Sequence, residues 1–583
     1  AVLLAFGLVV VPGQARSVDD PATANARPRI GLALSGGGAR GFSHVGVLRA
    51  LEALRVPVDC IAGTSAGSAV GAAYALGLSP DEIEAHLKAT DWDGDIFNDQ
   101  PSRPELPFRA KERLGGAPIA ITLGLGEEGL RGTAGVFAGQ KIELFLHRML
   151  QYSAELESFD QLALPFRAVA TDLATGTMVV QDRGSLVHAV RASMAVPSVF
   201  APVRIGRQLL VDGGLTQNLP VQAVRQACAD TVIAINIGSP LLQPEELTNV
   251  FSVAMQIVSI LMERNVVDSL ASLGQGDVLI VPDLQGVSAV DFSRGTQGIP
   301  AGEAATLAAR ASLARLALSP QEYSDWQAQR VARRLVPPRV GGVRVAQTRF
   351  VNPDVFSLPG VLGKGEQIGE IDSEALERTI RRWSGSGDFT SIAYSLRPDR
   401  SGYTLWVDPQ EKSWGPDYVQ LGFAGFADSH SNADFAVSAI LRKTWQNRSG
   451  GEWLSRAHFG RKRELETRWF QPLGVGSPWY VEPRLRVTSQ PRKVFANNVV
   501  LGEFTTEREE LEIGGGVQDS FGEAHFGLVR SLAKTSSHIG FTNIDPFRTN
   551  VSGWRLRLTH DSLDDLDFPR SGSAVRIETF HSL

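Results

Sequence analysis

From Tyr418 to the end of the chain, the sequence shows no helical pattern and repeats short segments in which polar and apolar residues alternate. In "WYVEPRLRV" (residues 479–487) Trp479, Val481, Leu485 and Val487 would face one side, and Glu482, Arg484 and Arg486 would face the other. A soluble β-sandwich also alternates, but a strongly charged face suits a wet interior, and aromatic residues near segment ends suit the girdles of a membrane barrel. We therefore expect residues 415–583 to form a transmembrane β-barrel.

The number of these segments bears on whether the barrel can close. We count about nine, whereas single-chain bacterial barrels have an even number of strands. The last segment, "SAVRIETFHSL", has no visible partner after it. We expect the barrel to continue beyond residue 583.

The N-terminal half has a different sequence pattern, in which short β-branched runs alternate with helical segments. The runs are Ile30–Leu34, Val58–Ala62, Phe166–Thr171, Thr231–Ile237 and Val278–Val281. Such alternation predicts a mostly parallel sheet covered by helices on both faces. We expect a three-layer α/β domain over residues 29–285.

The two halves are joined by two further segments. Residues 286–335 are expected to form a helical linker, because Pro300–Arg334 is rich in Ala, Leu and Arg and has a helical pattern. "VPPRVGG" then marks a break. Residues 340–410 have the pattern strand, helix, strand, strand, which predicts a small α/β domain.

The chain's start and its composition limit the kind of protein. Residues 1–15 form an apolar run ending in small residues, which is typical of a secretory signal peptide whose first residues are missing. A net charge of −6 and a pI near 6.0 argue against a nucleic-acid partner. The two cysteines, Cys60 and Cys228, are too few for a disulfide framework. We expect both to be buried, inert thiols.

The stretch "GLALSGGGARG" contains Gly36, Gly38 and Gly41 in the G-x-G-x-x-G spacing of a dinucleotide-binding loop. That reading requires an acidic residue at the end of the next strand, to hold a ribose. Asp59 instead stands at the start of that strand. A P-loop is excluded because no Gly-Lys-Ser/Thr follows.

The second strand ends in Gly63-Thr64-Ser65-Ala66-Gly67, which is the G-x-S-x-G pattern of a nucleophile elbow. Gly63 and Gly67 would permit a sharp turn that presents the hydroxyl of Ser65 at the edge of the sheet. The small-residue helix that follows would direct its N-terminus at the reacting centre. Ser65 is therefore the candidate nucleophile.

A serine nucleophile needs donors for an oxyanion and a base. The backbone N–H groups of Gly36, Gly37 and Gly38 are candidates for the oxyanion hole, and Arg40 adds positive charge nearby.

The base is less obvious, because a His after the acid would be usual. Four histidines fall in this region, His44, His86, His147 and His188, and none follows a late strand. Asp212 does, at the end of a short apolar strand, and Gly213 and Gly214 after it leave room for a close approach. Asp212 is the candidate base.

The motifs "GGGARGFSHVGVL", "GTSAG" and "DGG", in this order, resemble those of the patatin-like phospholipases over about residues 29–285. The resemblance implies a Ser65–Asp212 dyad in which the Asp activates the Ser directly. It also implies that His44 belongs to the motif but lies outside the dyad, so a structural role under the glycine loop is expected for it.

The rest of the chain also resembles known modules. Residues 340–410 are weakly similar to a POTRA domain, and the alternating segments with "DDLDFPRSGSAVRIE" resemble barrels of the BamA and two-partner-transporter superfamily. Signal peptide, patatin-like domain, POTRA and barrel are the order of the type Vd autotransporters. The resemblance implies a hydrolase carried to the cell surface by an outer-membrane translocator.

These observations together predict a phospholipase A-type lipid acyl hydrolase that uses no metal or cofactor. Its expected partners are a phospholipid or other lipid ester and the outer membrane, and a homodimer is compatible with the sequence. Three alternatives remain open: a hydrolase of neutral lipids or small esters, a non-catalytic translocator or adhesin, and a dinucleotide-dependent enzyme.

Overall fold

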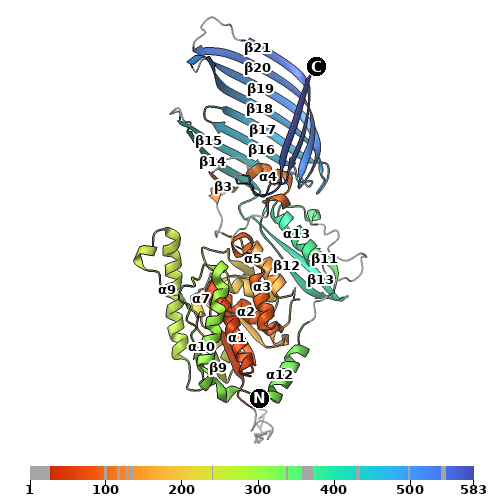
Figure 1. Ribbon diagram of the computed structural model, residues 1–583. Helices are drawn as coiled ribbons and strands as arrows, with labels where there is room; N and C mark the ends of the chain where they lie inside the picture. The colour runs from red at the N-terminus through yellow and green to blue at the C-terminus, as the bar shows by residue number, and fades with distance from the viewer. Residues whose placement is uncertain are drawn as a thin grey trace, which may run out of the picture.

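The computed structural model has three parts in chain order, an α/β domain, a small domain and a large curved sheet (Figure 1). It describes residues 27–583 except 97–101, 115–118, 127–128, 132–136, 152, 239, 336–338, 357–371, 401, 428–432, 497–498, 540–546 and 567. The expected signal segment, residues 1–15, lies outside the described residues. Among the described helices, none combines the length and apolar character needed to cross a bilayer.

The α/β domain is built on one sheet with the strand order β10-β9-β1-β2-β5-β8-β7, and β6 pairs with β5. The first five strands of this order are parallel, and β8 and β7 are antiparallel additions at one edge. The strands are β1 (Ile30–Leu34), β2 (Cys60–Thr64), β5 (Phe166–Asp172), β6 (Met178–Gln181), β7 (Val203–Ile205), β8 (Gln208–Asp212), β9 (Thr231–Ile235) and β10 (Val278–Ile280). The expected α/β class is confirmed.

Helices cover this sheet, and the apolar strands between them are almost wholly buried. They are α1 (Ser43–Ala53), α2 (Ala66–Leu76), α3 (Pro80–Lys88), α5 (Gln140–Met149), α6 (Leu186–Ser193), α7 (Gly214–Gln217), α8 (Val221–Ala227) and α9 (Val250–Ala271). The helix α2 consists largely of Ala, Gly and Ser, and all of its residues are buried. Small side chains allow this helix to pack closely against the sheet and hold the turn before it in place.

The segment expected to be a linker is helical but packs onto the α/β domain. It forms α10 (Ile299–Ala308), α11 (Arg310–Leu313) and α12 (Pro320–Ala332). A Cβ on Gly302 of α10 would lie 2.0 Å from the carbonyl oxygen of Ser43, so only glycine permits this approach to α1. Arg330 of α12 lies over the ring of Tyr74 and donates hydrogen bonds to two backbone carbonyls of the domain. These helices are therefore part of the domain, because their apolar faces complete its core.

The small domain follows the expected order of strand, helix, strand, strand. Its elements are β11 (Val340–Val345), α13 (Ser373–Ser384), β12 (Phe389–Asp399) and β13 (Gly402–Glu411), with the sheet order β11-β13-β12. It is fixed to the α/β domain through β12. The side chain of Gln140 donates to the carbonyl of Ile392 and accepts from its N–H, and the N–H of Glu155 donates to the carbonyl of Leu396.

In the described part of the chain, the large sheet contains nine consecutive antiparallel strands, which equals the number of segments expected from the sequence. They are β14 (Asp417–Ala427), β15 (Ala433–Lys443), β16 (Glu452–Phe459), β17 (Arg463–Pro472), β18 (Trp479–Ala496), β19 (Val499–Asp519), β20 (Gly522–Ile539), β21 (Phe547–Asp561) and β22 (Ala574–Ser582). On β18, Leu485 and Val487 are 47% and 41% exposed, whereas Glu482 and Arg484 are only 3% and 7% exposed. Apolar residues facing outward and charged residues facing inward are the arrangement of a membrane barrel.

Residues of the α/β domain also contribute to this sheet, which no sequence pattern indicated. The hairpin of β3 (Ile119–Gly126) and β4 (Gly129–Arg131) lies in the chain before α5, yet β3 pairs antiparallel with β14. The preceding helix α4 (Phe108–Leu114) lies at the end of the sheet nearest the small domain (Figure 1). Its Arg109 is buried over the ring of Phe470, and its guanidinium nitrogens lie 3.2 and 3.0 Å from carboxylate oxygens of Glu452 and Glu482.

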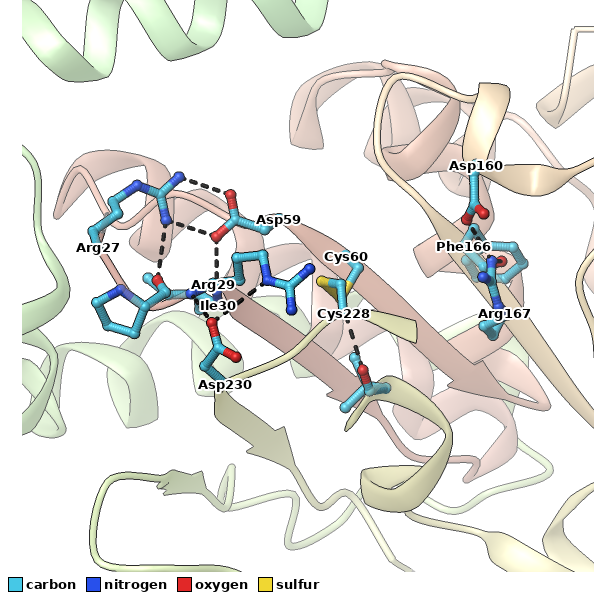
Figure 2. The surroundings of a disulfide bond; sticks show 12 residues. Arg27, Arg29, Ile30, Asp59, Cys60, Asp160, Phe166, Arg167, Cys228 and Asp230 are labelled. Carbon is cyan, nitrogen blue, oxygen red and sulfur yellow. Dashed lines mark hydrogen bonds and ion pairs between the residues drawn. A yellow bond between two sulfur atoms is a disulfide. The ribbon is translucent and has the colours of Figure 1, made fainter. Parts of the chain in front are cut away.

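The two cysteines correct a further expectation, because they form a disulfide (Figure 2). Cys60 opens β2 and Cys228 follows α8, with their Cα atoms 6.2 Å apart. They are 168 residues apart in sequence, and only the packing of α8 against β2 brings them together. A disulfide is expected in an oxidising compartment outside the cytosol.

We expect the double variant Cys60→Ser/Cys228→Ser to lose about 2–5 kcal/mol of unfolding free energy, because the bond restricts a long loop of the unfolded chain. Denaturant unfolding of the full chain in detergent micelles, with and without reductant, measures this loss. Reductant should lower the midpoint of the wild type and leave that of the double variant unchanged. Equal midpoints for the oxidised and the reduced wild type would contradict the prediction.

Candidate active site

Ser65 occupies the turn between β2 and α2, with φ 52° and ψ −125°. This backbone conformation is rare for a residue with a side chain and is typical of functional turns. A Cβ on Gly63 would lie 2.5 Å from the carbonyl oxygen of Gly67, and one on Gly67 would lie 2.4 Å from that of Leu34. Both flanking positions of the G-x-S-x-G pattern thus require glycine, because the chain folds tightly back on itself there.

The turn is held by a residue that the sequence did not single out. The N–H of Ser65 donates to the hydroxyl of Ser193, 2.9 Å away, and that hydroxyl donates to the carbonyl of Val169. Ser193 ends α6 and is fully buried. Ser193 stands in an ordinary helical run, so no sequence pattern indicated its contact with Ser65. That contact depends on how α6 packs on the sheet.

Asp212 ends β8, is fully buried and faces Ser65. The N–H of Gly214 donates to its Oδ1 over 2.7 Å, and a Cβ on Gly213 would lie 2.2 Å from the carbonyl oxygen of Val169. Burial raises the pKa of Asp212 to about 6, against the lowering effect of hydrogen bonding by Gly214 and Ser65. Its Oδ2 has no well-formed hydrogen bond to the described residues. Such loose contacts are common in hydrolases without substrate.

The glycine loop lies directly against Ser65. A Cβ on Gly36 would lie 2.9 Å from the Cβ of Ser65, and one on Gly38, at φ 57°, would lie 2.1 Å from the carbonyl oxygen of Ala289. The N–H of Gly36 donates to the carbonyl of Asn218. Within the described part of the chain, no acceptor pairs with the N–H of Gly37 or Gly38. Those two groups are therefore available to an oxyanion, whereas the N–H of Gly36 is occupied.

Two other members of the glycine motif have structural contacts. The guanidinium of Arg40 donates to the carbonyls of Ile237, Leu284 and Val287, so it fastens the loops after β9 and β10 rather than reaching an oxyanion. His44 is fully buried, with Nε2 2.9 Å from the carbonyl oxygen of Ser35, and burial lowers its pKa to about 4. A neutral His beneath the loop agrees with the structural role expected for it.

The remaining histidines have contacts away from the dyad. His147 stacks on Tyr394 of the small domain, with ring centres 3.7 Å apart. His188 lies 3.4 Å from a carboxylate oxygen of Glu143, and His86 belongs to the surface helix α3. Groups of three or more possible metal ligands are absent from the described residues.

The position of Asp59 decides against the dinucleotide alternative. It lies before β2, at the amino end of the parallel strands, where both of its oxygens bind the guanidinium of Arg27 (Figure 2). It also accepts the N–H of Ile30 over 2.7 Å. The glycine loop is at the opposite, carboxyl end of β1, so Asp59 cannot reach a nucleotide held there.

A cavity of about 1010 Å³ lies between the α/β domain, the small domain and the large sheet. Its wall includes His188, Arg397 and Arg468 from these three parts, but neither Ser65 nor Asp212. We therefore do not assign it to the substrate of the dyad.

A second strand that turns sharply through a serine with positive φ into a helix, between two positions that require glycine, has the geometry of the nucleophile elbow of α/β hydrolases. Residues 32–225 match the family model of the patatin-like phospholipases. This part of the chain is a patatin-like phospholipase domain.

Sequence relatives agree with this domain assignment. Patatin-like phospholipase domain-containing protein 6 of mouse and of human are each 35% identical to the chain over 212 residues, 36% of its length. An uncharacterized NTE family protein of Mycobacterium bovis is 33% identical over 214 residues, 37% of its length. The chain spans 14% and 13% of the mouse and human proteins and 50% of the mycobacterial one.

Solved structures with some likeness include BamA from Haemophilus ducreyi, at a TM-score of 0.31 and 10% identity over 42% of this chain and 48% of that one. VipD from Legionella pneumophila has a TM-score of 0.26 and 15% identity over 48% of this chain and 67% of that one. Scores this low do not establish a shared fold by themselves.

We expect kcat/KM for a short-chain ester to fall about tenfold per pH unit below pH 6, because Asp212 can accept a proton only when ionised. Above that pH the rate should level off. A profile of kcat/KM from pH 4.5 to 8.5, recorded on the full chain in micelles, measures this fall on the acidic side. Full recovery at pH 8 after acid exposure is the control against unfolding. An apparent pKa near 4 would contradict the prediction.

Proposed function

We propose that the chain hydrolyses the acyl ester bonds of glycerophospholipids through a Ser65–Asp212 dyad. The observation that carries the proposal is that Ser65, in a turn with positive φ, faces the buried carboxylate of Asp212 beside the unpaired N–H groups of Gly37 and Gly38. Nucleophile, base and oxyanion donors are the three elements that acyl transfer requires.

The reaction takes place in two halves. Asp212 accepts the proton of the Ser65 hydroxyl while Oγ bonds to the ester carbonyl carbon, and the N–H groups of Gly37 and Gly38 stabilise the negative oxygen. The ester C–O bond then breaks, and the lysophospholipid leaves with the proton from Asp212. Water, activated by the same carboxylate, attacks the acyl-Ser65 ester and releases the fatty acid. No metal or cofactor has a place in these steps.

We expect Ser65→Ala and Asp212→Asn to reduce phospholipid hydrolysis by about 10³-fold or more, because each removes one reacting group. The assay follows fatty acid released from a defined phosphatidylcholine in mixed micelles by the full chain. Arg204→Ala, at an exposed strand position, is a matched control and should retain full activity.

The outcomes separate the alternatives. Activity on triacylglycerol or a small ester but not on phospholipid would change the substrate class and keep the dyad. Undiminished hydrolysis by Ser65→Ala would reject the dyad. No hydrolysis by the wild type would favour a translocator or adhesin without catalysis.

The proposal also includes location: the large sheet is an outer-membrane barrel that carries the hydrolase to the cell surface. The outward apolar and inward charged faces of the sheet support a membrane position. In Figure 1 the α/β domain lies at the same end of the sheet as the small domain. Export would therefore require the buried contacts of Arg109 with Glu452 and Glu482 to break.

We expect protease added to intact Gram-negative cells that express the full chain to cleave the α/β domain, if it has reached the surface. A soluble periplasmic protein in the same cells should stay intact and serves as the control. Cleavage only after the outer membrane is permeabilised would place the domain on the inner side and reject surface display.

A further inference from the structure

The short segment after Asp212 is held by one side chain from the long helix α9. Asn265 donates through Nδ2 to the carbonyl of Gly214 over 2.7 Å, and its Oδ1 accepts the N–H of Asn218, also over 2.7 Å. Because the oxygen and the nitrogen of the amide have different partners, its orientation is defined. Asn265 thus spans α7, from the residue that binds Asp212 to the residue that follows the helix.

Asn218 continues this connection to the glycine loop. Its carbonyl accepts the N–H of Gly36 over 3.2 Å, and its Nδ2 donates to the carbonyl of Gly36 over 3.4 Å. Asn218 is only 3% exposed. One buried residue thereby holds both polar backbone groups of Gly36, directly before the two N–H groups that are free.

The same side chain borders the nucleophile and the base. A Cβ on Gly36 would lie 2.7 Å from Oδ1 of Asn218 and 2.9 Å from the Cβ of Ser65. A Cβ on Gly214 would lie 3.1 Å from that Oδ1 and 3.0 Å from Oδ1 of Asp212. Oδ1 of Asn218 is buried and has no hydrogen-bond partner among the described residues. The amide therefore lies between the glycine loop and the Asp212 turn.

We propose that Asn265 and Asn218 are positioning residues of the hydrolysis reaction, which together fix the Asp212 turn relative to Ser65 and to the oxyanion donors Gly37 and Gly38. The inference rests on the proposed function of the dyad and adds α9 to the active site. It follows from the contacts, because the chain Asn265–Asn218–Gly36 joins three segments that meet at Ser65. A displacement of about 1 Å in such a site can cost about 10²-fold in rate.

This role differs from a general contribution to stability. The described residues in the N-terminal part of α9 are half-buried or exposed, and the buried Val266 and Ser269 anchor its C-terminal part independently of the amide. Loss of the Asn265 amide would free Gly214, whose N–H lowers the pKa of Asp212. A positioning role therefore predicts a change in the acidic limb of the pH profile, which a purely structural role would not produce.

The test compares three variants of the full chain in mixed micelles: Asn265→Ala, Asn265→Asp and the control Asn249→Ala. For each variant, kcat, KM, the thermal midpoint and the pH profile are measured. Asn265→Ala should lower kcat by about 10- to 100-fold, with KM within twofold of wild type, and should move the acidic limb to higher pH. Asn265→Asp keeps the acceptor for Asn218 but cannot donate to Gly214, and it should show the same shift with a smaller loss of kcat.

The matched control is Asn249→Ala. Asn249 caps the other end of the same helix by accepting the N–H of Ser252. The Asn249→Ala variant should keep the wild-type kcat and pH profile, even if its thermal midpoint falls. If Asn265→Ala does not fold, the kcat and the pH profile of Asn265→Asp decide the question.

The proposal is overturned if folded Asn265 variants keep the wild-type kcat and acidic limb, or if Asn249→Ala loses as much activity as Asn265→Ala. Ser65→Ala, measured in parallel, distinguishes failure of the positioning role from failure of the proposed dyad. If Ser65→Ala is inactive while Asn265→Ala is fully active, only the positioning role is wrong. If Ser65→Ala stays active, the proposed function itself is wrong.

Discussion

The close approach of three backbone segments around Ser65 is the constraint on which the candidate site depends. The turn after β2 crosses the end of β1 at Gly67, the glycine loop touches Ser65 at Gly36, and the Asp212 turn meets β5 at Gly213. Each contact is too short for a side chain, so the glycines are required by packing. The result is a buried carboxylate beside a strained serine, in which burial raises the pKa of Asp212 to about 6 against the lowering effect of hydrogen bonding by Gly214 and Ser65.

In the large sheet, charged residues face inward and apolar residues face outward. Its buried carboxylates are compensated by arginines on the same or neighbouring strands, as where Arg486 lies 2.6 Å from Glu466. Arg109, supplied by the α/β domain, joins this set of paired charges. A buried ion pair that loses one partner leaves an uncompensated charge, which is costly. The insertion of α4 therefore ties the hydrolase domain to the sheet by electrostatics as well as by the pairing of β3 with β14.

Patterns that are local in sequence predicted much of this protein. Period-two alternation indicated nine strands after Tyr418, and the switch between apolar runs and helical patterns indicated the α/β sheet. The elbow at Ser65, the turn at Asp212 and the loop at Gly36 were found because glycine must stand where the backbone approaches closely. The position of Asp59 at the start of its strand was enough to disfavour a nucleotide site.

Contacts between distant residues could not be predicted, because each depends on how finished elements pack. Cys60 and Cys228 became a disulfide only when α8 lay on β2, and residues 286–335 became part of the domain only when Gly302 met α1. The pairing of β3 with β14 and the link from Asn265 to Gly36 likewise have no local signature. The sequence by itself determined which segments are strands, helices and tight turns, since these follow from hydrophobic period and backbone freedom. The tertiary structure decided which side chains meet, since burial and hydrogen bonding are set only when the segments pack together.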